Sequence, residues 1–120
     1  MPKRILIADD DEDSRKLIRR FLESNTTCEV CGEAVNGADA IAKAETLNPD
    51  LILLDYSMPG MNGIETGEVL KAMMPEVPVI LFTGDDSFAI QCAARSVGIK
   101  AVVPKDQMGR LAGRVVSLLD

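Results

Sequence analysis

The chain has 120 residues, of which 47% are apolar and 27% charged, with a net charge of −6 and no histidine. This length suits one domain with a buried core, the charge disfavours direct binding to nucleic acid or to an anionic membrane, and the lack of histidine excludes Ser-His-Asp and Cys-His catalysis. No apolar run approaches the roughly 18 residues of a membrane span. Residues 1–4 lead directly into a short apolar run instead of a signal peptide, so we expect a cytoplasmic protein.

Apolar runs alternate with segments of helical periodicity along the whole chain. Runs rich in Ile, Val and Leu, each short enough for a strand, lie at residues 4–8, 29–35, 51–54, 78–82 and 101–103. After each run, apolar residues recur at helical spacing, which predicts helices marked by Leu17, Ile18, Phe21 and Leu22, by Ala40, Ile41, Ala44 and Leu47, by Ile64, Val69, Leu70 and Met73, by Phe88, Cys92, Ala93 and Val97, and by Met108, Leu111, Val115 and Leu118. Five strands that alternate with five helices predict right-handed βαβ units and a parallel sheet covered on both faces.

The predicted sheet has central and edge strands. The runs at 51–54 and 79–82 are almost entirely apolar, as expected for strands buried on both faces of a parallel sheet. Residues 29–34 mix charged and apolar side chains, which suits an edge. No linker, repeat or low-complexity tract interrupts the pattern, so we predict one α/β domain over residues 1–120.

The cysteines do not indicate a disulfide or a zinc site. Cys28 and Cys31 have the C-x-x-C spacing, but residues three apart on a strand point to opposite faces of the sheet. No histidine or second cysteine pair completes a zinc site. We therefore expect reduced thiols, with Cys92 in the core beneath the fourth helix.

Acidic side chains follow two of the predicted strands. Asp9 and Asp10 close the run at 4–8, and Asp55 closes the run at 51–54. The carboxyl ends of parallel strands meet at one edge of the sheet, where ligands bind in open α/β folds. Carboxylates crowded at this edge repel one another and raise each other's pKa. An acidic site built only from oxygen atoms favours a hard cation such as Mg²⁺.

Two further polar residues belong to the same edge. The fourth strand ends near Thr83, and the fifth is followed by Lys105. A carboxylate beside a hard cation can attack phosphorus and become an aspartyl phosphate. The transferred phosphoryl group then needs positive charge and hydrogen-bond donors around its oxygens, which a lysine and a threonine supply.

The residues at this edge resemble those of the receiver domain of two-component response regulators. The resemblance covers essentially the whole chain and rests on Asp9, Asp10, Asp55, Thr83 and Lys105. In addition, the stretch DYSMPGMNG at residues 55–63 is similar to the family's D-x-x-M-P-x-M-x-G. The resemblance implies the chemotaxis-regulator-like fold, which is a doubly wound, flavodoxin-like three-layer sandwich whose five parallel strands have the order 2-1-3-4-5.

The resemblance also implies a phosphoacceptor switch of a two-component phosphorelay. Asp55 would accept the phosphoryl group from a histidine kinase or a phosphotransfer protein, and Thr83 and Lys105 would bind that group. Such a domain is an enzyme only in the narrow sense that it catalyses its own phosphorylation and dephosphorylation. Family kinases dock near the first helix, whose basic residues here are Arg15, Lys16, Arg19 and Arg20.

The implied cofactor is Mg²⁺. Its ligands would be Asp10, Asp55 and the backbone carbonyl of Ser57, with Asp9 acting mostly through water. Two positions depart from the family pattern. Three residues before Lys105, where the family usually has an aromatic signalling residue, this chain has Val102. Valine has one stiff side-chain torsion and no ring to move, so we expect helix or backbone movement to transmit the signal. The proline that usually follows the lysine precedes it here, as Pro104.

Partners of the family commonly bind the face formed by the fourth helix, the fifth strand and the fifth helix. Here that face would carry Phe88, Arg95, Lys100, Arg110 and Arg114. The basic cluster is compatible with ordinary solvated arginines and also with an acidic partner, which would be a downstream protein or an effector domain. We expect no direct contact of this domain with nucleic acid or membrane, and a monomer or a phosphorylation-dependent dimer.

Other interpretations fit parts of the pattern. Asp9-x-Asp11 is similar to the D-x-D motif of Mg²⁺-dependent phosphohydrolases of the haloacid dehalogenase type, but that fold needs a longer chain. A calcium loop starting at Asp9 would have Ser14 instead of glycine at its sixth position and Arg20 instead of glutamate at its twelfth. A receiver-like binding module that is not phosphorylated is the remaining alternative. Such modules usually lose an acid or the lysine, and this chain keeps all of them.

Overall fold

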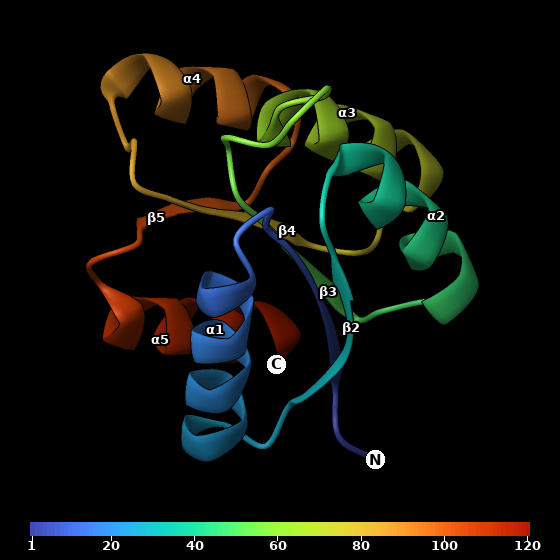
Figure 1. Ribbon diagram of the computed structural model, residues 1–120, viewed down its shortest axis with the longest axis vertical. Coiled ribbons are helices and arrows are strands. Elements are labelled where there is room, and N and C mark those ends of the chain that lie inside the picture. Colours follow the sequence, from blue (N-terminus) through green and yellow to red (C-terminus); the bar gives the residue numbers. More distant parts are fainter.

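Strands and helices alternate five times along the chain (Figure 1). In the computed structural model, which describes residues 1–120, the elements are β1 (Arg4–Ala8), α1 (Glu12–Asn25), β2 (Glu29–Ala34), α2 (Gly37–Leu47), β3 (Leu51–Leu54), α3 (Gly63–Met73), β4 (Val79–Thr83), α4 (Phe88–Ser96), β5 (Ala101–Pro104) and α5 (Met108–Leu119). The predicted strand limits agree with these to within one residue. None of the helices has the length and apolar character needed to cross a membrane.

The five strands form one sheet in the order β2-β1-β3-β4-β5, and every neighbouring pair is parallel. This confirms the expected flavodoxin-like topology. The apolar strands β3 and β4 lie inside the sheet, and β2 and β5 form its edges. From β1 the chain first adds β2 on one side of the sheet and then returns to add β3 on the other side of β1. The strand order therefore reverses between β1 and β3, and a ligand site is expected beyond the carboxyl ends of these two strands.

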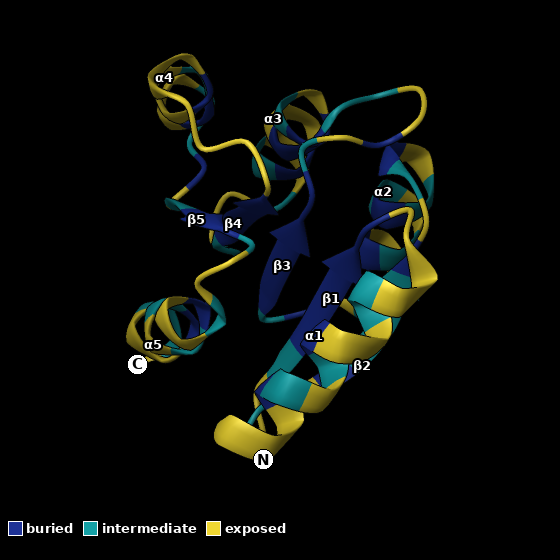
Figure 2. Cartoon of the chain, turned by 60° about the vertical axis from the view of Figure 1, so that its left-hand side comes forward, coloured by how far each residue is buried: buried dark blue, intermediate teal, exposed yellow.

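Side chains of alternate strand residues leave the sheet on opposite faces, and two hydrophobic cores result. In β1, Ile5 and Ile7 pack with buried residues of α1 and α5, whereas Leu6 and Ala8 pack with those of α2, α3 and α4. Figure 2 shows the buried strands between the two helical layers and the exposed outer sides of the helices. The expected three-layer sandwich is therefore confirmed.

Asparagine and serine side chains fix where three helices begin. Asn36 accepts a hydrogen bond from the backbone N–H of Asp39 at the start of α2, and Ser87 caps α4 in the same way. Asn62 and Glu65 form a reciprocal capping box at the start of α3. This capping box sets the end of the loop that begins at Asp55.

The buried faces of several helices differ from the prediction. The residues predicted for apolar faces that are in fact exposed are Leu17, Val69, Met73, Phe88 and Cys92. In α4, Ile90 and Ala94 are buried instead. Cys92 lies two positions from each of them, about 200° around the helix, so the prediction that it belongs to the core is wrong. Apolar residues occur on several sides of this short helix, and periodicity alone does not select the side that meets the sheet.

Candidate functional site

The carboxyl ends of β1 and β3 bring the predicted acidic residues together. Ala8 of β1 pairs with Leu54 of β3, so Asp9 and Asp55 are the next residues along two neighbouring strands. The backbone N–H of Asp55 donates to the carbonyl of Ala8 (2.9 Å), and the N–H of Asp9 donates to the carbonyl of Ala34 in β2 (3.0 Å). The sheet register therefore determines where both carboxylates lie.

Three carboxylates form a compact pocket at this edge. One oxygen from each of Asp9, Asp10 and Asp55 lies within 4.8 Å of the others. Asp9 and Asp55 are buried, with 1% and 8% of their surface exposed, whereas Asp10 is exposed. The pocket thus combines two buried acids from the sheet with a third that is open to solvent. We call it the acidic pocket.

Lys105 provides positive charge at the acidic pocket. Its ammonium nitrogen donates to Asp9 Oδ2 at 2.8 Å and to Asp55 Oδ2 at 3.0 Å. The backbone N–H of Lys105 donates to the carbonyl of Thr83 at 2.9 Å, which holds the loop after β5 against the end of β4. A single ammonium thus bridges two carboxylates from non-consecutive strands and offsets only part of the charge of three.

Burial and the contacts between Lys105 and the carboxylates act in opposite directions on the pKa values of Asp55 and Lys105. Burial raises the pKa of Asp55, and the charge of Asp9 adds to this, so the pKa lies above its ordinary value although Lys105 lowers it. Burial lowers the pKa of Lys105, but its hydrogen bonds to Asp9 and Asp55, together with their negative charges, outweigh this, and the pKa is raised. Lys105 is therefore held in the charged form, and its single positive charge offsets only part of the negative charge of the pocket.

The remaining predicted site residues lie around the same edge. Thr83, the last residue of β4, is buried, and its hydroxyl oxygen accepts a hydrogen bond from the backbone N–H of Asp85 at 3.3 Å. Ser57 is exposed in the loop that follows Asp55. Its predicted role concerns the backbone carbonyl, which lies in this loop two residues after Asp55.

The loop after Asp55 depends on one glycine. The N–H of Gly63 donates to the carbonyl of Tyr56 at 2.8 Å and closes the loop. A β-carbon at position 63 would collide with the backbone oxygen of Asp55 and approach Leu81 Cδ1 to 2.7 Å. The final glycine of the DYSMPGMNG stretch is therefore required by the close approach of α3 to the end of β3, where Asp55 lies.

Sequence reasoning missed one residue at this site. Arg15, in the first turns of α1, donates from its Nη1 to the backbone carbonyl of Asp9 at 2.7 Å. From the sequence it is one of several basic residues on a helix surface. Its contact joins α1 to the end of β1 and follows from the tertiary structure alone.

The donor set of the acidic pocket fits a small divalent cation. All of its side-chain ligand atoms are carboxylate oxygens, which is the chemistry that Mg²⁺ prefers, and the uncompensated negative charge favours a cation there. A pocket of two buried acids and one solvent-exposed acid also leaves access for water ligands, which Mg²⁺ usually retains.

The family model for the response regulator receiver domain matches residues 5–115. The chain belongs to the response regulator receiver family. The acidic pocket of this receiver domain is typical of the phosphoacceptor and Mg²⁺ sites of such domains.

Several relatives of this receiver domain are longer proteins. It is 42% identical over 80 residues to a protein-glutamate methylesterase/protein-glutamine glutaminase of Clostridium acetobutylicum, covering 67% of this chain and 23% of the relative. It is 41% identical over 83 residues to the response regulator protein VraR of Staphylococcus saprophyticus, covering 69% and 40%. The chain thus spans less than half the length of these curated relatives.

A solved structure supports the same fold. A CheY-like receiver domain protein of Methanospirillum hungatei superposes with a TM-score of 0.91 at 28% identity, and the match covers 100% of this chain and 95% of that one.

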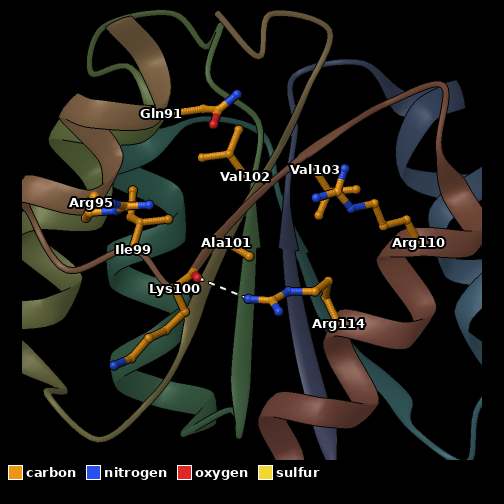
Figure 3. Close-up of a pocket in the computed structure, with 9 residues that line it drawn as sticks. All are labelled: Gln91, Arg95, Ile99, Lys100, Ala101, Val102, Val103, Arg110 and Arg114. Carbon is orange, nitrogen blue, oxygen red and sulfur yellow. Dashed lines mark hydrogen bonds between the residues drawn. The ribbon is translucent and has the colours of Figure 1, made fainter. Parts of the chain in front are cut away.

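A second feature of this receiver domain lies between α4 and α5, over the edge strand β5. A hollow of about 240 Å³ has a floor of small and branched side chains that includes Val102. Figure 3 shows the basic residues around it, which are Arg95, Lys100, Arg110 and Arg114. None of its nine lining residues is acidic, although the whole chain carries a net charge of −6. We call it the basic groove.

Proposed function

We propose that this receiver domain is a phosphorylation-dependent signalling switch with Asp55 as its phosphoacceptor. The observation that carries the proposal is the Lys105 ammonium, which lies 3.0 Å from Asp55 Oδ2 inside a pocket of three carboxylates. A buried carboxylate next to a fixed cation has the components that phosphoryl transfer requires: a nucleophile, and positive charge for the phosphoryl oxygens.

The phosphodonor is a phosphohistidine of a kinase or a phosphotransfer protein. An oxygen of Asp55 attacks the phosphorus; the new O–P bond forms as the P–N bond breaks, and the histidine nitrogen keeps the electron pair. Lys105 then turns from the carboxylates toward a phosphoryl oxygen, and the Thr83 hydroxyl, which can also donate, binds another. This chain has no histidine, so the donor must come from another protein or another part of the same protein.

The residues proposed to hold Mg²⁺ are Asp10, Asp55 and the backbone carbonyl of Ser57, with Asp9 acting through water. When bound, Mg²⁺ would supply additional positive charge for the phosphoryl oxygens. The chain's own contribution is to place the carboxylates: the β1–β3 register sets Asp9 and Asp55 side by side.

Intact mass after incubation with acetyl phosphate tests the proposal. Wild type should gain about 80 Da, the mass of one phosphoryl group, in the presence of Mg²⁺ and none when EDTA replaces it. Asp55→Asn has nearly the same shape but no nucleophilic carboxylate and should gain nothing.

A gain that persists in Asp55→Asn would place the acceptor elsewhere. No gain in wild type, with Mg²⁺ binding measured separately, would favour the alternative of a receiver-like binding module that is not phosphorylated.

We propose that the basic groove is the output surface and binds an acidic segment of a downstream protein or effector domain. Charge complementarity supports this, because four of the nine residues that line the groove are basic and none is acidic. The basic groove and the acidic pocket are also connected by a short stretch of chain, because Val102 lines the groove and Lys105 of the acidic pocket follows it by three positions.

Backbone amide NMR shifts on addition of beryllofluoride, a phosphoryl mimic, with Mg²⁺ test the connection between pocket and groove without a known partner. We expect shifts at both Lys105 and Val102 in wild type, and at neither in Asp55→Asn. Shifts confined to the acidic pocket would show that the groove does not respond to the acceptor.

A further inference from the structure

Arg15 makes two strong contacts that no other residue of α1 combines. Its Nη1 donates to the backbone carbonyl of Asp9 at 2.7 Å, and its Nε donates to Glu33 Oε1 at 3.0 Å. Only 12% of the Arg15 side chain is exposed, so solvent does little to weaken these bonds. One guanidinium thus ties the loop after β1 to the neighbouring strand β2.

Glu33 is the anchor of this arrangement. It accepts hydrogen bonds from Arg15 and also from Arg19 Nε, at 2.8 Å. Burial raises the pKa of Glu33, but the hydrogen bonds from Arg19 and Arg15 and their positive charges outweigh it, and the pKa is lowered. Glu33 therefore remains ionised, and its two oxygens hold two arginines in fixed positions.

The atom that Arg15 binds determines the position of the next residue. The carbonyl of Asp9 belongs to the peptide unit that joins Asp9 to Asp10, and this unit is planar. Fixing the carbonyl oxygen fixes the orientation of that plane, and with it the backbone nitrogen and Cα from which the Asp10 side chain extends. Asp10 is the exposed member of the acidic pocket, so its position is the one least determined by packing.

We infer that Arg15 and Glu33 act as a positioning pair, the Arg15–Glu33 clamp, which preorganises Asp10 for cation binding. The inference rests on the proposed function, since it assigns the clamp to the Mg²⁺ site of the phosphoacceptor pocket. Without the clamp, the Asp9–Asp10 peptide unit can rotate, and binding must fix it again, which lowers affinity. Residues that orient metal ligands from behind typically change metal affinity by about 10- to 100-fold.

The chain offers a matched control for this clamp. Arg19 also pairs with Glu33, but its second contact is to the carbonyl of Val30 at 3.3 Å, away from the loop. Arg19→Gln therefore removes one ion pair of Glu33 and leaves the Asp9 carbonyl bound to Arg15. Arg15→Gln removes one ion pair of Glu33 and also the contact with the Asp9 carbonyl. A role in stability alone would affect the two variants alike.

The experiment is a Mg²⁺ titration of wild type, Arg15→Gln and Arg19→Gln, followed by fluorescence of Tyr56. This residue adjoins Asp55 and is the only tyrosine in a chain without tryptophan. We expect the Mg²⁺ dissociation constant to rise about 10-fold in Arg15→Gln and to stay within about twofold of wild type in Arg19→Gln. Urea unfolding of the same variants measures stability separately.

Equal Mg²⁺ dissociation constants in wild type and Arg15→Gln would contradict the inferred role of the clamp and leave the proposed function intact. A rise of the same size in both variants would also overturn it, because the effect would then follow the loss of an ion pair and not of the Asp9 contact. Absence of Mg²⁺ binding in wild type would overturn the clamp and the proposed metal site together. Glu33→Gln gives an independent check and should weaken Mg²⁺ binding in the same direction as Arg15→Gln.

Discussion

At the scale of single residues, Lys105 serves two purposes. It hydrogen-bonds Asp9 and Asp55 and reduces the repulsion between them. In the proposed mechanism it binds the phosphoryl group. In that mechanism the same ammonium would stabilise first the pocket and later the product, and its release from the carboxylates would be part of the reaction.

The raised pKa of Asp55 leads to a prediction about stability. Because burial raises this pKa above the ordinary 3.8, the folded state disfavours the ionised carboxylate. The contribution of Asp55 to folding is therefore fully present below pH 3.8 and is lost as the pH rises through the higher folded value. An asparagine resembles the protonated form, so metal-free Asp55→Asn should unfold with a larger free energy than wild type at pH 7.

Urea unfolding in EDTA between pH 3.5 and pH 7 checks this prediction. The difference between Asp55→Asn and wild type should shrink as the pH falls and Asp55 becomes protonated in both states. A variant less stable than wild type at pH 7 would mean that the Lys105 contact outweighs the burial of the charge.

At the scale of elements, two glycines at different places in the fold should respond in opposite ways to alanine. Gly113 lies within α5, and a β-carbon there would meet nothing within 4 Å. Gly113→Ala should therefore raise the free energy of unfolding by about 0.5–1 kcal/mol, because glycine is a poor helix former. Gly63→Ala should lower it, since the new methyl group would collide with the Asp55 carbonyl. Thermal unfolding of the two variants makes the comparison; stabilisation by both would contradict the close approach at Gly63.

The sequence predicts strands better than it predicts the faces of helices. The strand positions follow from apolar runs that are buried on both faces, such as Leu51–Leu54, and their limits are correct to within one residue. The acidic pocket follows in turn, because Asp9 and Asp55 come directly after two of these strands. In α4, by contrast, the exposed Phe88 and Cys92 are as apolar as the buried Ala94. Only the position of the helix over the sheet decides between them.

The Arg15 contact could not be predicted for a related reason. Arginines on an amphipathic helix are ordinarily solvated, and nothing local to α1 distinguishes Arg15 from Arg19 or Arg20. The difference arises where β2 places Glu33 beside α1 and the end of β1 presents the Asp9 carbonyl. Such contacts depend on the angle at which a helix crosses a sheet, and that angle is set by the packing of the entire core.

At the scale of the whole molecule, the sheet divides the interior into two separate cores. Ile52 is buried in the core beneath α2, α3 and α4, and Ile18 is buried in the core beneath α1 and α5. Substitution of either isoleucine by valine should lower the free energy of unfolding by about 0.5–1.5 kcal/mol. Because the two cores share no side chains, the double variant should cost the sum of the single values to within about 0.5 kcal/mol. Urea unfolding of the single and double variants tests this; a larger deviation would show that the sheet transmits strain between its faces.

The position of β5 has a consequence for signalling in both directions. Val102 in the floor of the basic groove and Lys105 in the acidic pocket are joined by a segment only about 10 Å long when extended. Energetic coupling between two binding sites is reciprocal. If phosphorylation of Asp55 tightens the binding of a partner in the groove, the bound partner must favour the phosphorylated form by the same factor. A partner that binds the phosphorylated form more tightly would therefore also stabilise that form at equilibrium.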